Sequence, residues 1–183
     1  MVAELMRVFV AVPLDEETRH RLAHVVAERV PEIPGGAVDP QKWHLTLRFL
    51  GEVGEVEVDR IRHSLDTADL GGPFSVTWGG LGAFPRPARA SVLWVGVPRG
   101  ADELRSLWMA TELALEDAGF PPEDRPFRPH LTIARIRPPE DVSLVVGGEP
   151  LANVPMKVDR ITLFQSRLGR GGASYSIVDE FAL

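Results

Sequence analysis

Apolar residues recur along the chain with two spacings, one typical of helices and one typical of strands. Leu104, Leu107 and Leu115 would share one face of a helix over 101–118. In WHLTLRFL, residues 43–50, apolar and polar side chains alternate instead, as in a strand with one buried face. The same criteria predict strands at 7–12, 43–50, 74–81, 91–97, 130–136, 158–164 and 175–181, and helices at 16–30, 55–70, 101–118 and 139–145.

The chain repeats part of its own sequence. VFVAVP (8–13) matches LWVGVP (93–98) at an offset of 85, and HLTL (44–47) matches HLTI (130–133) at an offset of 86. Within each half, one amphipathic helix and a proline-rich loop lie between the two matching segments. A period this long indicates a duplicated half rather than a solenoid. We therefore predict a single two-lobed domain, 1–183, with repeat units near 7–81 and 91–165.

This order of elements favours an α+β fold. We expect two pseudo-symmetric lobes of antiparallel sheet, with helices outside and a cleft between the sheets. Side chains two residues apart on a strand share a face, so His44 and Thr46 would point to the same side. His130 and Thr132 would do the same in the second half. The four polar side chains would then converge on the cleft.

Two His-x-Thr sequences in equivalent places are hard to explain by chance. Five histidines and seven threonines in 183 residues would form about 0.2 such pairs at random. The alternative is that His44 and His130 are structural and hydrogen-bonded within the sheet. Buried polar groups need partners, however, and a paired set facing a cleft favours a ligand.

Two imidazoles suit acid–base chemistry. Their ordinary pKa of about 6.5 lets one accept a proton from water while the other gives one to a departing oxygen. Threonine hydroxyls can donate to phosphoryl oxygens as charge builds up on them. Such a set supports in-line displacement at phosphorus without a metal. A strained cyclic phosphodiester suits it, since its single negative charge and sugar leaving group lower the demand on the site.

Charge and composition restrict the partners. Acidic residues outnumber basic ones by 26 to 20, giving a net charge of −6, which argues against a protein that coats long nucleic acid. A pocket for one phosphate remains compatible with this charge. The absence of cysteine excludes disulfides, thiolate zinc sites and a cysteine nucleophile, and it permits the cytoplasmic location that we expect. The apolar runs are short, and we expect no membrane span and no signal segment.

The segments WHLTLRFLG and RPFRPHLTIAR resemble the paired H-x-T-x motifs of the two-histidine phosphoesterase superfamily. Within it, the chain is similar to the RNA 2′,3′-cyclic phosphodiesterase (2′-5′ RNA ligase) family over nearly its whole length. The likeness includes RVFVAVPL, GAFP, VLWVGV and LFQSRLGRGGASY, and it is weakest over residues 137–155.

The resemblance implies hydrolysis of RNA 2′,3′-cyclic phosphate ends to 2′-phosphate ends, without metal or cofactor. It also implies reversible 2′-5′ ligation as a side activity. His44 would be the proton donor and His130 the proton acceptor, with Thr46 and Thr132 on the phosphate oxygens. Taken alone, the residues leave the acid and base roles open, because the halves are nearly symmetric. The expected partners are RNA ends or small cyclic nucleotides, and no obligate protein partner is implied.

Further contacts to the substrate are predicted around the motifs. By strand alternation Arg48 should share the cleft face with His44, whereas Arg135 would need a bulge to reach it. The family likeness includes Arg125 and Arg135, which could bind phosphate or form surface salt bridges. Phe49 and Phe127 could stack on a base or pack into the cleft wall.

Two competing hypotheses use other features of the sequence. His20 and His24 stand four residues apart on the first predicted helix and could bind a metal, but an exposed helix face explains them better. A non-catalytic module that binds an RNA end or a nucleotide phosphate would use the same cleft without needing an acid and a base.

Overall fold

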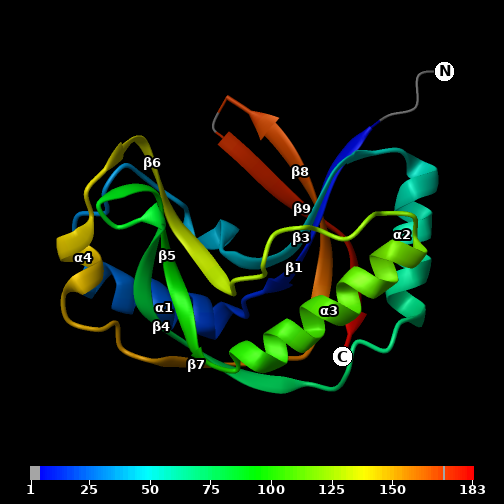
Figure 1. Cartoon of the computed structure of the whole chain (residues 1–183), viewed down its shortest axis with the longest axis horizontal. Coiled ribbons are helices and arrows are strands. Elements are labelled where there is room, and N and C mark those ends of the chain that lie inside the picture. Colours follow the sequence, from blue (N-terminus) through cyan, green and yellow to red (C-terminus); the bar gives the residue numbers. More distant parts are fainter. Residues whose placement is uncertain (1–4, 171) are drawn as a thin grey trace.

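The computed structural model describes residues 5–170 and 172–183 and contains two antiparallel sheets with helices on their outer faces (Figure 1). The four-stranded sheet has the order β3-β1-β8-β9, and the five-stranded sheet has the order β2-β6-β5-β4-β7. This is the predicted α+β fold of two lobes. The strands of the first sheet are β1 (Met6–Pro13), β3 (His44–Val53), β8 (Arg160–Gly169) and β9 (Gly172–Ala182). Those of the second are β2 (Gly36–Ala37), β4 (Phe74–Arg86), β5 (Arg89–Arg99), β6 (His130–Glu140) and β7 (Val154–Val158).

The two sequence halves exchange strands. Each sheet contains one of the matching pairs, β1 with β3 in the four-stranded sheet and β5 with β6 in the five-stranded sheet. The next strand in each sheet comes from the other half: β4 pairs with β5, and β8 pairs with β1. The lobes therefore do not coincide with the repeat units near 7–81 and 91–165, because each half completes the sheet of the other.

The helices are exchanged in a similar way. They are α1 (Glu16–Arg29), α2 (Glu55–Thr67), α3 (Ala101–Asp117), the short α4 (Ser143–Gly147) and the 3₁₀ turn η1 (Pro40–Lys42). α1 follows β1 but packs against β7 of the other sheet, and α3 follows β5 but packs with α2 over the four-stranded sheet. In Figure 1, α2 and α3 lie together at one end of the molecule, and α1 lies toward the other end.

Local sequence signals explain where these helices begin. Asp15 caps α1, since its carboxylate accepts a hydrogen bond of 2.7 Å from the backbone N–H of Thr18. The φ angle of Gly100, before α3, is +86°, and a Cβ there would lie 2.7 Å from the carbonyl oxygen of Ser75. Only glycine fits this position without strain.

Some element boundaries differ from those predicted. The helix expected at 139–145 is α4, which begins only at Ser143, because β6 continues past two prolines and pairs Glu140 with Ala90. Proline is tolerated there because β2 reaches only as far as Arg135, so the end of β6 has a neighbouring strand on one side. β7 was not predicted, although it alternates buried and exposed residues. Within residues 5–170 and 172–183, no helix combines the length and apolar character needed to cross a membrane.

Candidate active site

The two His-x-Thr pairs meet at one cavity between the sheets. His44 and His130 are the first residues of β3 and β6, and Thr46 and Thr132 follow two residues later on the same faces. All four side chains line a cavity of about 520 Å³, which we call the central cavity. On each strand, alternation turns the His and Thr side chains to the cavity and the leucine between them to the opposite face. Both pairs therefore meet in the same cavity.

Both imidazoles are held by the same local hydrogen bond. Nδ1 of His44 lies 2.8 Å from the carbonyl oxygen of Lys42, and Nδ1 of His130 lies 2.6 Å from that of Arg128. A carbonyl oxygen only accepts, so Nδ1 carries the proton and donates it. The neutral rings therefore keep an unprotonated Nε2, which is the nitrogen able to accept a proton from a ligand.

Aromatic rings fix each imidazole from the side. The ring of His44 lies 4.8 Å from that of Phe9 and meets Tyr175 edge-on, with centroids 5.2 Å apart and planes at 88°. The ring of His130 meets Phe84 edge-on, at 4.9 Å and 90°. These contacts limit rotation of the rings and exclude water from one side of each.

Burial shifts both imidazoles toward the neutral form. Burial is the main cause that lowers the pKa of His44 to about 4, and the charges of Arg135 and His130 add to it. Burial and the charge of Arg135 also lower the pKa of His130. In each case the backbone hydrogen bond opposes the shift. Both rings are neutral at pH 7 in the unliganded protein, and a bound anion would raise both pKa values.

A bulge in β3 changes which residues face the central cavity. Thr46 pairs with Ala11 and Arg48 pairs with Val10, which leaves Leu47 as an extra residue on β3. An extra residue inverts the alternation of faces beyond it. As a result Phe49 lines the central cavity, where either stacking on a base or packing in the cleft wall would place it.

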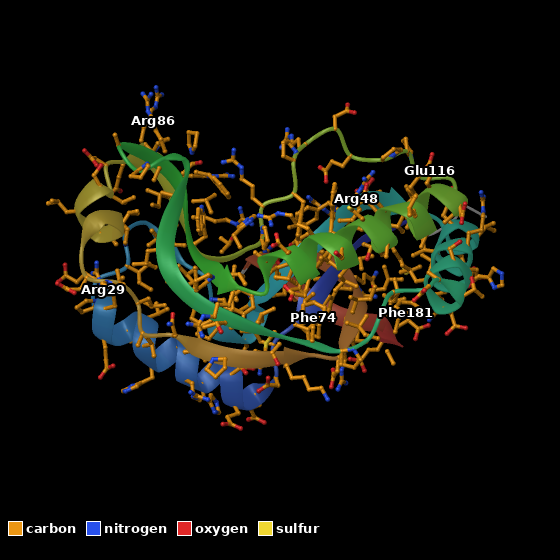
Figure 2. The ribbon with its side chains drawn as sticks, turned by 60° about the horizontal axis from the view of Figure 1, so that its bottom comes forward. Arg29, Arg48, Phe74, Arg86, Glu116 and Phe181 are labelled. Carbon is orange, nitrogen blue, oxygen red and sulfur yellow. The ribbon has the colours of Figure 1, made fainter. Side chains whose placement is uncertain are left out.

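The prediction that Arg48 shares the cleft face is wrong because of this bulge. Its guanidinium turns to the helix side of the sheet, where Nη1 lies 2.5 Å from Oε2 of Glu112 on α3. Nη2 donates to the carbonyl oxygen of Pro121. Figure 2 shows Arg48 beside α3. Arg48 therefore holds a helix and a loop in place and does not line the central cavity.

The second half contains the same irregularity. In β6 one extra residue separates Thr132 from Ala134, at the position that corresponds to the bulge of β3. Beyond it, Arg135 lines the central cavity. The bulge that Arg135 was expected to need is thus present, and Phe49 and Arg135 occupy equivalent places in the two halves.

Two other predicted contacts lie away from the cavity. Arg125 is exposed on the loop between α3 and β6 and is not among the residues lining the central cavity. Phe127 stacks on Trp108 of α3, with ring centroids 5.3 Å apart and planes at 4°. A hydrogen bond from the backbone N–H of Glu123 to Glu112 fixes this loop against α3. Phe127 therefore packs against the helix instead of facing a base.

Sequence reasoning missed several residues of the site. Arg7, Lys42 and Arg137 join Arg135 in the wall of the central cavity, and no carboxylate is among the described residues that line it. Alternation along β1 could have identified Arg7, since it shares a face with Phe9. Arg137 lies two residues beyond Arg135 on β6 and shares its face, whereas Lys42 comes from the turn η1, where pattern gives no direction. Four cations without an acid, in a chain of net charge −6, make this cavity suited to an anion.

The helical histidine pair shows no metal-binding arrangement. His20 and His24 are exposed on α1, and Nε2 of His24 lies 3.3 Å from a carboxylate oxygen of Glu28. Among residues 5–170 and 172–183, no group of three or more His, Cys, Asp or Glu side chains is arranged to hold a metal ion.

Two half-buried imidazoles and two hydroxyls in a cationic cleft between duplicated halves are an arrangement typical of a phosphoesterase. Comparison with known proteins gives the particular family. The family described as LigT-like phosphoesterases matches residues 12–94 and again residues 95–175, and the chain belongs to this family.

Its relatives share most of its length. The chain is 38% identical to the RNA 2′,3′-cyclic phosphodiesterase of Aeropyrum pernix over 81% of this chain and 86% of that protein. It is 32% identical to the one of Escherichia coli, over 100% of this chain and 99% of that protein. The crystal structure of Escherichia coli LigT in apo form superimposes with a TM-score of 0.83 at 28% identity, over 99% of both chains. Its complex with 3′-AMP gives 0.82 at 29% identity, over 98% of this chain and 99% of that one.

Proposed function

We propose that this protein hydrolyses 2′,3′-cyclic phosphate ends of RNA to 2′-phosphate ends. The observation that carries the proposal is the convergence of two His-x-Thr pairs on one cationic, carboxylate-free cavity. The names of its full-length relatives, which are RNA 2′,3′-cyclic phosphodiesterases, supply the substrate class.

The hydroxyls and cations would hold the reacting phosphate. Thr46 and Thr132 would each donate to a non-bridging oxygen, and Arg135 would balance the charge of the anion. The bound anion would raise the pKa of both imidazoles and so allow one of them to carry a second proton at neutral pH. Binding of the substrate would thus itself favour the protonated histidine that acts as the acid.

The reaction is an in-line displacement at phosphorus. Water would give a proton to Nε2 of His130 while its oxygen bonds to phosphorus. The bond from phosphorus to O3′ would break as Nε2 of His44 delivers its proton to O3′, leaving the phosphate on O2′. The same steps with a 5′-hydroxyl in place of water would form a 2′-5′ linkage, and they are reversible. The roles of the two histidines follow the family resemblance.

The test is incubation with a short RNA that ends in a 2′,3′-cyclic phosphate, in the presence of a metal chelator. The product should be the 2′-phosphate isomer, identified by nuclease digestion and chromatography against both isomers. A 3′-phosphate product would contradict the assignment of the leaving oxygen. Binding without turnover would replace this proposal with that of a non-catalytic binding module.

A further inference from the structure

A second cavity adjoins the central cavity along the four-stranded sheet. It also measures about 520 Å³, and we call it the outer cavity. On β1, residues 7–9 line the central cavity, and residues 12–13 line the outer cavity. Residues 14–15, directly after the strand, also line the outer cavity. On the antiparallel neighbour β8, the order is reversed: Ser166 and Leu168 line the central cavity, and Phe164 lines the outer one. The cavities therefore follow one another along the strand direction.

Three side chains form the boundary between the two cavities. Lys42, His44 and Tyr175 line both of them. A ligand whose reacting group contacts His44 could therefore continue from the central cavity into the outer one. A single nucleotide end would leave the outer cavity to solvent.

The carboxylates in the outer cavity are already engaged. Asp15 accepts two hydrogen bonds of 2.7 Å from Thr18, one from its backbone N–H and one from its hydroxyl. Asp159 and Glu180 lie 2.9 Å and 3.6 Å from the guanidinium of Arg160. Their hydrogen bonds and neighbouring cations lower the pKa of Asp15 and of Asp159, so both remain ionised within these contacts.

The two lysines of the chain both line the outer cavity. Lys42 and Lys157 are the only lysines among 20 basic residues, and the other 18 are arginines. Neither forms an ion pair with any residue of the described ranges. Lys157 helps to lower the pKa of Asp159, yet neither ammonium group is held in an ion pair, and together they provide a site for a second anion, outside the place where the reacting phosphate sits.

We propose that the outer cavity binds the phosphodiester that precedes the reacting nucleotide, so that the preferred substrate is an oligoribonucleotide rather than a cyclic mononucleotide. This inference depends on the proposed function. In an in-line displacement the attacking and leaving oxygens lie on opposite sides of phosphorus. With His44 at the leaving O3′, the terminal ribose lies on the His44 side, and its strand continues toward the outer cavity. Phe164 and Tyr175 offer ring surface there for a base.

The test compares two substrates: adenosine 2′,3′-cyclic phosphate and an adenosine trinucleotide that ends in a 2′,3′-cyclic phosphate. In Lys157→Ala, the ratio of kcat/KM for the trinucleotide to that for the mononucleotide should fall about tenfold. Lys157→Arg should restore most of the ratio. Arg60→Ala removes one charge from the exposed surface of α2, away from both cavities, and should leave the ratio unchanged. Because Lys157 is exposed, thermal unfolding should show that both of its variants remain folded.

Each outcome decides the proposal. An unchanged ratio in Lys157→Ala overturns it. A raised KM for the 5′-hydroxyl strand in ligation, with an unchanged hydrolysis ratio, would assign the outer cavity to the incoming strand and also overturn it. If the wild type turns over neither substrate, the proposed function fails instead. Binding of the trinucleotide with a terminal 2′-phosphate would then test the cavity, and equal affinities of wild type and Lys157→Ala would reject it.

Discussion

The imidazoles of His44 and His130 have equivalent positions in the repeat but different surroundings. His44 is packed among Phe9, Phe164 and Tyr175, whereas His130 contacts Phe84 and Trp94. The pKa of each is lowered, and that of His44 falls to about 4. Two titrating groups in unequal environments are what an acid–base pair requires, since one must hold a proton while the other lacks it.

Replacing either histidine should remove most of the activity. His44→Ala or His130→Ala should each lower kcat on a cyclic phosphate end by a factor of about 10²–10⁴, the usual contribution of a positioned acid or base. The double variant should be little worse than the poorer single variant, because the two groups act in one step. The affinity for the 2′-phosphate product, measured by titration calorimetry, should fall only a few-fold. His63→Ala, on the exposed side of α2, is the control. Turnover that survives in the double variant would contradict the mechanism.

The rate should depend on pH with two limbs. Because the pKa values of both histidines are lowered in the unliganded protein, the optimum of kcat/KM should lie below pH 6.5. Acid protonates the base and alkali deprotonates the acid, which gives a bell-shaped profile. The optimum of kcat should lie at higher pH, since the bound anion raises both pKa values. Arg135→Gln removes a charge that lowers the pKa of both histidines, so it should move the optimum of kcat/KM to higher pH. A profile that is flat from pH 4 to pH 9 would exclude two titrating histidines.

At the scale of elements, the paired bulges decide which face each residue occupies. Without an extra residue in β3, Arg48 would face the central cavity and Phe49 would face the helices. With it, Arg48 is buried against Glu112 and Pro121 and connects β3 to α3 and to the loop that leads to His130. One irregularity therefore shapes the cavity wall and also anchors the neighbouring helix.

Breaking this buried ion pair should destabilise the protein. Arg48→Met would leave the carboxylate of Glu112 without its cation, and the free energy of unfolding should fall by about 3 kcal/mol. The double change Arg48→Met and Glu112→Leu should cost less than the sum of the single changes, as measured by urea unfolding. Arg105→Met, which breaks an exposed pair with Asp102, should change stability little. Additive losses at Arg48 and Glu112 would show that the pair is not coupled.

At the scale of the whole molecule, the exchange of strands and helices makes the two halves depend on each other. β4 and α1 from the first half complete the five-stranded sheet, and β8 and α3 from the second half complete the four-stranded one. The core beneath these elements is continuous from one lobe to the other. Neither sheet can lose its borrowed strand without exposing apolar surface.

Unfolding should therefore occur as one cooperative transition despite the two lobes. Trp78 on β4 reports on one sheet, and Trp108 on α3 reports on the other. The chain has four tryptophans. In a version that keeps only Trp78, and in one that keeps only Trp108, with the other three replaced by Phe, fluorescence and far-ultraviolet circular dichroism of the same protein should give the same midpoint of urea unfolding. Two separate transitions within one protein would show that the lobes are independent.

The sequence by itself determined the elements and the chemical groups. Period-two and helical spacing are local properties, so they located nearly all strands and helices. The duplicated His-x-Thr segments put two imidazoles and two hydroxyls on equivalent strand faces. Missed or misplaced boundaries, at β7 and at the start of α4, fall where prolines and short strands weaken the pattern.

Only the tertiary structure decided how these parts are combined. A bulge depends on pairing with the neighbouring strand, so alternation counted along β3 alone placed Arg48 on the wrong face. Loop residues have no periodicity. The sequence therefore could not predict the packing of Phe127 on Trp108 or the position of Lys42 in the cavity wall with His44. Strand exchange between the halves is likewise invisible in a linear pattern, because the free energy that selects partners comes from burying one half against the other.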